Sequence, residues 1–309
     1  MNNSQFLIGV GVVLALLILP LVSLVLVRVL IPLKEEPDDL AVESEPPMEF
    51  TTLRDFWEGT IPHLRELRDR LIKCAIAIGL GAGVGIWLVN DSSLLGERLP
   101  VIISKHFIGD RDLIATQVAE TFVTYMRIAI IVGIILAMPV IVYQVIAFFV
   151  PAMRPVEKRI VFSALPFVTE LFLAGLAFGW MFTVPTAVQW LLDYGTGENI
   201  QSLPRVEDFY SIVATLMLWN GVIFELPAII YLLARLGLVS AQTLGRTRRY
   251  AFVVIVIVAA LITPTGDPFN LMLLAVPMYL LYELGILLAR FVPRRTSDGL
   301  PEGVSHVGG

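Results

Sequence analysis

One carboxylate interrupts a run of residues that is otherwise apolar enough to cross a bilayer. Glu225 lies within residues 211–234, and a helix needs about 20 apolar residues to span the hydrocarbon core. An ionisable side chain at that depth is costly, so it marks either a ligand- or proton-binding group or a buried hydrogen bond to a neighbouring helix. Asn220 and Pro227 in the same run predict a polar, kinked place that faces other protein. The sequence leaves both interpretations of Glu225 open.

A second carboxylate, Glu170, poses the same question within the apolar segment 167–172. It lies nearer one end of its run, so a carboxylate that reaches towards the interface is a third interpretation. We group Glu225, Asn220 and Glu170 as a candidate intramembrane polar patch. Asp267 precedes a later apolar run and is expected to cap a helix or form a turn.

Two other carboxylates lie among cations. At helical spacing Glu66 shares one face of the segment 61–73 with Arg70, which predicts an i,i+4 ion pair. Glu157 lies in the short polar segment 151–159 between two apolar runs. Each carboxylate also has an interpretation without a binding function. The segment that contains Glu66 can be the interfacial, amphipathic start of a helix, and Glu157 can be a solvated acid beside basic neighbours.

Several common activities leave signatures that this sequence lacks. It contains no Gly-x-x-x-x-Gly-Lys-Ser/Thr loop, so no nucleotide-driven motor is predicted. The pairs Gly79/Gly83 and Gly81/Gly85 are small residues at four-residue spacing, which favours close helix packing over a phosphate-binding loop. The single cysteine, Cys74, excludes an intrachain disulfide. Nor do the histidines share a metal-ligand spacing: His63, His106 and His306. We therefore expect no enzyme activity, no metal and no cofactor.

The elements that must position these residues are membrane helices. A mean hydropathy of +0.80 and 57% hydrophobic residues indicate an all-α polytopic membrane protein. The apolar runs are 6–33, 72–90, 122–150, 159–192, 209–235, 249–264 and 269–292. Because 249–264 is short and ends at a tight turn, we expect residues 249–292 to form a hairpin of two short helices.

Basic residues separate the ends of these runs into two sets. The larger set is Arg28, Lys34, Arg54, Arg65, Arg68, Arg70, Lys73, Arg154, Lys158, Arg159, Arg235, Arg246, Arg248, Arg249, Arg290, Arg294 and Arg295. The smaller set is Arg98, Lys105, Arg111, Arg127 and Arg205. The positive-inside rule places the larger set in the cytoplasm. The last six spans then begin and end inside, in a cytoplasmic membrane, and the run 6–33 adds a helix whose N-terminus is external.

The first run and the segment after it stand apart from the rest. Residues 6–33 lack a basic start, are long for a signal peptide and end near Arg28 and Lys34, which favours a retained anchor over a cleaved signal. Seven acids then cluster in a proline-containing segment that reads as a solvated linker. They are Glu35, Glu36, Asp38, Asp39, Glu43, Glu45 and Glu49.

Taken in order, several short segments resemble the TatC family, the signal-receptor subunit of the twin-arginine protein translocase. The resemblance covers about residues 60–292. The matching segments are His63-Leu-Arg-Glu-Leu-Arg68, Leu113-Ile-Ala-Thr116, Pro139 to Ala152, Leu173-Ala-Gly-Leu-Ala-Phe178, Phe224-Glu-Leu-Pro227, Arg248-Arg-Tyr250, Leu261-Ile-Thr-Pro264 and Ala275 to Glu283.

This resemblance implies a six-helix, glove-shaped receptor that binds precursors of folded proteins and is driven by the proton gradient. It implies that Glu66 and Glu157 receive the paired arginines of the signal peptide, and bidentate pairing of carboxylate with guanidinium fits that role. Arg68 would position Glu66, whereas Arg65 and Arg70 would contact lipid headgroups. The implied partners are single-span TatA/TatB-type subunits, further copies of the chain and the lipid bilayer, but no nucleic acid.

The family position of Glu225 is an intramembrane glutamate on the concave face. The chain departs from the family in three places: the extra helix at its start, the carboxylate at Glu170, and a divergent loop before Leu113.

These observations divide the chain into four parts. They are an N-terminal anchor (1–33), an acidic cytoplasmic linker (34–59), the six-helix core (60–292) and a cytoplasmic tail (293–309). The alternative function is a proton- or ion-coupled transporter that uses Glu225 and Glu170 as relay groups, although no internal repeat is visible.

Overall fold

The computed structural model describes residues 53–109, 111–149, 165–194, 203–235, 237–263 and 267–292. The predicted first span, the acidic cluster and the tail lie outside these residues, as does Glu157. The helices follow in this order: α2 (Leu53–Asn90), α3 (Leu99–Ile108), α4 (Glu120–Phe149), α6 (Leu165–Phe178), the π-helix η2 (Gly179–Thr183), α7 (Val184–Asp193), α8 (Val206–Phe224), α9 (Leu226–Arg235), α10 (Ala241–Arg246), α11 (Arg248–Ile262) and α12 (Pro268–Arg290). The described residues are otherwise loops, with one isolated bridge between Ile114 and Arg205.

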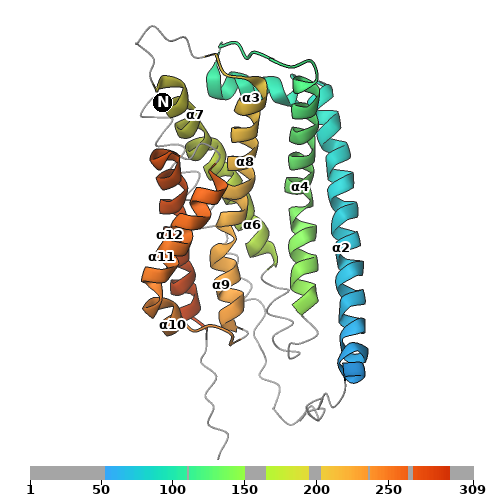
Figure 1. Ribbon diagram of the computed structural model, residues 1–309, viewed down its shortest axis with the longest axis vertical. Coiled ribbons are helices and arrows are strands. Elements are labelled where there is room, and N and C mark those ends of the chain that lie inside the picture. Colours follow the sequence, from blue (N-terminus) through green and yellow to red (C-terminus); the bar gives the residue numbers. More distant parts are fainter. Residues whose placement is uncertain are drawn as a thin grey trace, which may run out of the picture.

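Helices α2 and α4 form a long antiparallel pair at one side of the molecule (Figure 1). Small residues let their backbones approach: a Cβ on Gly81 would lie 2.6 Å from the carbonyl oxygen of Gly133, and one on Gly85 would meet the backbone of Ala129. The predicted packing role is confirmed for Gly81 and Gly85. For the pair Gly79/Gly83 it stays a prediction, because a Cβ at either position would meet nothing within 4 Å among the described residues.

The next two spans are interrupted helices. A π-turn joins α6 to α7, and α8 gives way to α9 at Glu225. Pro227 has no amide hydrogen to continue the helical ladder, so the chain closes a tighter turn, in which the Glu225 amide donates to the Val222 carbonyl at 3.1 Å. The kink predicted from Pro227 is therefore confirmed, and it lies at the residue that made this span unusual.

The C-terminal pair differs in part from expectation. Helix α11 is short, as predicted, but α12 has 23 residues and is long enough to cross a membrane unaided. The prediction of two short helices is thus wrong for α12, whose apolar run continues past Pro277 without a break. Asp267 caps this helix as expected, because its carboxylate accepts a hydrogen bond from the Asn270 amide at 2.8 Å.

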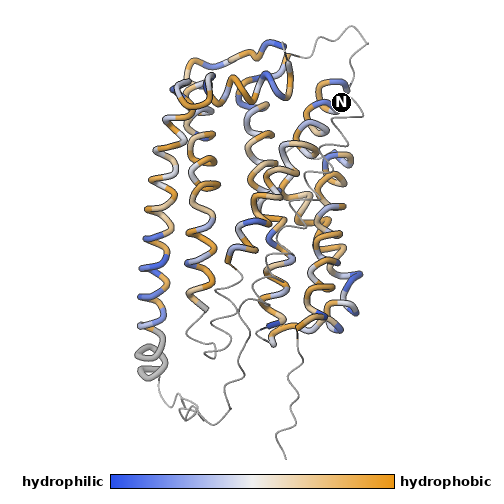
Figure 2. Tube along the Cα trace, turned by 180° about the vertical axis from the view of Figure 1, so that it is seen from behind, coloured by the Kyte–Doolittle hydropathy of each residue, from blue (hydrophilic) through white to orange (hydrophobic). Residues whose placement is uncertain are grey.

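The helices stand roughly side by side, with α3 lying across one end (Figure 1). Hydrophobic residues occupy much of the middle of the molecule, whereas hydrophilic ones gather at its two ends and along the part of α2 that follows its grey start (Figure 2). Among the described residues, five helical segments are long and apolar enough to span a membrane: Ile61–Asn90, Glu120–Phe148, Leu165–Asp193, Val206–Arg235 and Pro268–Arg290. The all-α, polytopic prediction is confirmed, and α11 provides the short sixth element.

Candidate functional site

Glu66 lies near the charged end of α2 and is held from one side. The Arg70 guanidinium donates two hydrogen bonds to Oε1 of Glu66, from Nε at 3.1 Å and from Nη2 at 2.5 Å. The i,i+4 pair predicted from the sequence is therefore confirmed. Oε2 lies 4.0 Å from Nδ1 of His63. The Glu66 side chain keeps 31% of its surface exposed, and both hydrogen bonds from Arg70 end on its other oxygen.

The same cluster is tied to α4. Nη1 of Arg70 donates to Oε1 of Gln144 at 3.4 Å, and the ring of His63 stacks on that of Phe148 with centroids 4.3 Å apart. Both partners lie in the last two turns of α4. These contacts limit how far the Glu66 carboxylate can turn, because the side chain that holds it is itself held by a second helix.

Two expectations about neighbouring arginines need correction. Arg68 does not position Glu66: its guanidinium pairs with Asp69 on the exposed side of α2, at 2.8 Å. Arg70 does so instead, and it is engaged with protein groups, not left for lipid headgroups. The reason is helical geometry, since residues four apart face each other and residues two apart do not. Glu157, the second predicted arginine ligand, lies outside the described residues.

Glu225 lies in an apolar cavity of about 220 Å³ formed by α4, α6, α8 and α9. We call this space the Glu225 cavity. It is lined by Met138, Ile141, Val142, Val145, Ile146, Phe167, Val168, Val222, Glu225, Ala228, Ile229, Tyr231, Leu232 and Arg235. Glu225 is 4% exposed, and neither carboxylate oxygen has a hydrogen-bond partner among the described residues. A buried carboxyl group without partners is rare and costly, so Glu225 is a candidate binding group.

The predicted polar patch does not gather around Glu225, because neither Asn220 nor Glu170 lines the Glu225 cavity. Asn220 is buried and satisfied: its amide donates to the Leu216 carbonyl at 2.8 Å, and its Oδ1 accepts from the Thr183 hydroxyl at 3.2 Å. It therefore locks α8 to the π-turn of the neighbouring span. Glu170 is half-buried on α6.

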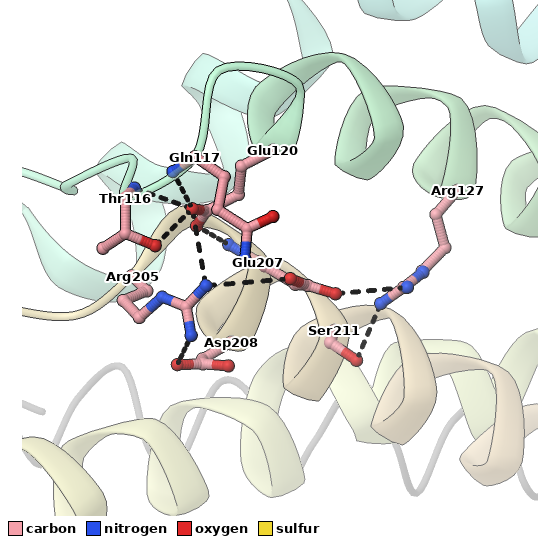
Figure 3. A network of polar contacts seen from close by, with 8 residues as sticks. All are labelled: Thr116, Gln117, Glu120, Arg127, Arg205, Glu207, Asp208 and Ser211. Carbon is pink, nitrogen blue, oxygen red and sulfur yellow. Dashed lines mark hydrogen bonds and ion pairs between the residues drawn. The ribbon is translucent and has the colours of Figure 1, made fainter.

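A second buried carboxylate, Glu120, which the sequence did not single out, is the first residue of α4, and Figure 3 shows the polar contacts around it. Oε2 of Glu120 accepts hydrogen bonds from the Thr116 amide at 2.7 Å, the Thr116 hydroxyl at 2.9 Å and the Gln117 amide at 3.1 Å. Oε1 accepts from the Glu207 amide at 3.1 Å, and Arg205 lies 3.5 Å from Oε2. One side chain thus joins the start of α4 to the start of α8.

The surroundings of Glu120 extend this junction. The Val206 amide donates to the Ile114 carbonyl at 3.0 Å, and the Arg127 guanidinium lies 3.4 Å from both Glu207 and Ser211. A sequence signal existed: an acid in the first turn of a helix, following a threonine four residues earlier, is typical of a helix start. The long-range donors gave no such signal, because they come from a segment more than eighty residues away.

Comparison with known proteins decides the family. Residues 62–277 match the family model for the Sec-independent protein translocase protein TatC. A relative from Carboxydothermus hydrogenoformans, the Sec-independent protein translocase protein TatC, is 33% identical over 237 residues, which are 77% of this chain and 95% of the relative. The protein of the same name from Escherichia coli K12 is 37% identical over 231 residues, 75% of this chain and 88% of the relative. The chain belongs to the TatC family.

A solved TatC structure has the same fold. The crystal structure of a twin-arginine translocase receptor, TatC, superposes with a TM-score of 0.65 at 30% identity, over 75% of this chain and 100% of that one. The resemblance read from short motifs is thus confirmed. This TatC-family chain is a multi-pass membrane protein and a protein translocase component, not an enzyme.

Proposed function

We propose that this chain receives the twin-arginine signal peptides of folded precursor proteins, with the carboxylates of Glu66 and Glu157 binding the two arginines. The observation that supports the proposal most strongly is that Arg70 holds Glu66 by one oxygen only: Arg70 donates to Oε1, while Oε2 lies 4.0 Å from Nδ1 of His63 and the Glu66 side chain stays 31% exposed. An incoming guanidinium can bind this oxygen without breaking the existing pair. The carboxylate is also held in place beforehand, which lowers the entropy lost on binding.

The position of this carboxylate fits a peptide that continues into the membrane. Glu66 lies in the charged turns of α2 that precede its apolar part. Through Arg70 and His63 it is close to the end of α4, which also contributes to the Glu225 cavity. In the proposed complex the apolar stretch of the signal peptide follows this surface. Glu225 then provides a polar contact for a later step, in which a single-span TatA/TatB-type subunit packs against the cavity.

The remaining parts of the proposal concern assembly and energy. Several copies of the chain would act together in a receptor complex within the cytoplasmic membrane. The C-terminus would lie in the cytoplasm and the added first helix would begin outside, as the distribution of basic residues predicts. The proton motive force would drive transport, as the resemblance to the TatC family implies, and the sequence contains no nucleotide-binding loop.

Peptide binding tests the arginine-receptor proposal. The protein in lipid nanodiscs is titrated with a fluorescent signal peptide that carries Arg-Arg, and with a matched peptide that carries Lys-Lys. Glu66→Gln should weaken Arg-Arg binding roughly tenfold or more, because a charge-assisted hydrogen bond contributes about 1.5–3 kcal/mol. Glu157→Gln should act similarly. Asp69→Asn is the matched control on the same helix and should leave the affinity within about twofold.

Two results would overturn the proposal. One is equal affinity for the Arg-Arg and Lys-Lys peptides. The other is export of a twin-arginine reporter at the parental level by a variant that carries both Glu66→Ala and Glu157→Ala. The transporter alternative predicts a different result, namely a proton flux that requires substrate and disappears in Glu225→Gln. It is not favoured here, since Glu170 does not share the Glu225 cavity.

A further inference from the structure

A second cavity lies where α9, α10 and α12 meet, at the end of the molecule at which α9 and α12 finish. Its volume is about 960 Å³. We call it the arginine cavity. It is lined by Ala234, Arg235, Gly237, Val239, Ser240, Ala241, Gln242, Gly245, Arg246, Arg248, Ala289, Arg290 and Val292. The lining brings together four arginines from four helices, and none of the described residues that form it is a carboxylate.

Most of this positive charge is not neutralised within the described part of the chain. Arg248 pairs with Glu283 at 2.7 Å. The structure gives Arg235, Arg246 and Arg290 no ion pair with any described carboxylate. Three uncompensated guanidinium groups around one open cavity repel one another, and an anion between them removes that repulsion.

The rest of the lining favours an anion with an apolar part. Ala234, Val239, Ala289 and Val292 provide apolar wall between the arginines. Leu238 and Phe291 adjoin lining residues in the sequence, and they leave 68% and 64% of their surfaces exposed. An ion that is entirely polar gains nothing from these surfaces, whereas an amphiphile buries them.

The position of the arginine cavity in the fold also favours an anion with an apolar part. Arg235 and Arg290 are the last residues of α9 and α12, and both helices belong to segments that can span a membrane. Span ends lie near the phosphate layer of a bilayer, and basic cavities between span ends are suited to phospholipid headgroups. The arginines also offset the negative ends of the two helix dipoles, which would otherwise repel a phosphate.

We propose that the arginine cavity binds the phosphate headgroup of an anionic phospholipid, with Arg235, Arg246 and Arg290 on the phosphate and the acyl chains along Leu238 and Phe291. Arg235 also lines the Glu225 cavity. The bound lipid would therefore lie at one end of α9, with Glu225 at the other end of this helix, about 15 Å away.

The test uses purified, delipidated full-length protein in a neutral detergent. It is titrated with phosphatidylglycerol, with phosphatidylcholine and with inorganic phosphate, and bound molecules are counted by native mass spectrometry. Phosphatidylglycerol should bind at least about tenfold more tightly than phosphatidylcholine. The triple variant Arg235→Gln, Arg246→Gln, Arg290→Gln should lose that preference, since each basic residue near a headgroup contributes a severalfold factor. Arg249→Gln is the matched control, because Arg249 packs on the Tyr250 ring and does not line the cavity.

A second measurement needs no variant. Phenylglyoxal modifies accessible arginines, and peptide mass spectrometry reports which ones. Phosphatidylglycerol should protect Arg235, Arg246 and Arg290 but leave Arg249 reactive. The proposal is wrong if the triple variant and the control lose lipid equally, or if protection is equal at all four arginines. Inorganic phosphate that competes with the lipid at equal concentration would identify a free-anion site and also overturn it.

Discussion

Two buried carboxylates at different depths in the same protein have opposite surroundings. Glu120 is 5% exposed and accepts hydrogen bonds from three backbone amides and one hydroxyl, with Arg205 close by. Glu225 is 4% exposed, and neither of its oxygens has a partner among the described residues. Burial alone does not separate a structural acid from a functional one. The number of hydrogen-bond donors that contact the carboxylate distinguishes the two cases, because an unsatisfied buried group destabilises the fold that contains it.

The largest expected effect is at Glu120. Replacement by Ala leaves the amides of Thr116, Gln117 and Glu207 without an acceptor and removes the link between α4 and α8. We expect unfolding in detergent to require about 3–5 kcal/mol less free energy, as when a buried charged network loses one member. Glu97→Gln, in an exposed pair with Lys105, is the control and should cost less than about 1 kcal/mol. A loss at Glu120 no larger than at Glu97 would contradict its structural role.

Asn220 sharpens the comparison, because it shares a helix with Glu225 but is satisfied like Glu120. Asn220→Ala removes hydrogen bonds to Thr183 and Leu216 and leaves a small void. The expected loss is about 2–3 kcal/mol in the same unfolding measurement. If Asn220→Ala were neutral, the residue would belong with Glu225 in a functional patch, as the sequence first led us to expect.

At Glu225 we expect a substitution to stabilise the protein, in contrast to the substitutions at Glu120 and Asn220. Glu225→Met replaces an unpartnered carboxyl by an apolar side chain of similar length in an apolar cavity. We expect the free energy of unfolding to rise by about 1–2 kcal/mol. Thermal unfolding in detergent measures the change, and the loss of a monodisperse gel-filtration peak is used to monitor it. A destabilised Met variant would show that Glu225 has a structural partner.

The smallest effect is expected at the exposed edge of the Glu120 network. Arg127 lies 3.4 Å from Glu207, and both side chains are largely solvated. Arg127→Ala should cost less than about 1 kcal/mol, and less still at high salt, where exposed charges are screened. Unfolding at low and high ionic strength separates this pair from the core of the network. A large effect that does not depend on salt would mean that the network acts as one unit.

The sequence alone predicted those features that depend on near neighbours. The Glu66–Arg70 pair, the kink before Pro227 and the cap at Asp267 involve residues within four positions of each other, and all three are present. The apolar runs likewise located the spans. The second predicted arginine ligand, Glu157, stays a prediction.

Features that depend on distant partners were missed or misjudged. Glu120 looked like an ordinary acid at a helix start, since its remaining donors come from the start of α8. Asn220 looked like a companion of Glu225, although helix geometry turns it towards Thr183. Periodicity gives the face of a helix but not the identity of the neighbour, so satisfied and unsatisfied polar groups look alike in a sequence.

The central claim is that Glu225 is kept unpartnered for function at the expense of stability. One paired measurement on Glu225→Met tests it most directly: the unfolding temperature of the purified protein, and export of a folded twin-arginine reporter from cells whose only copy carries the change. We predict a higher unfolding temperature together with export reduced at least about tenfold. A lower unfolding temperature, or export at the parental level, would contradict the claim.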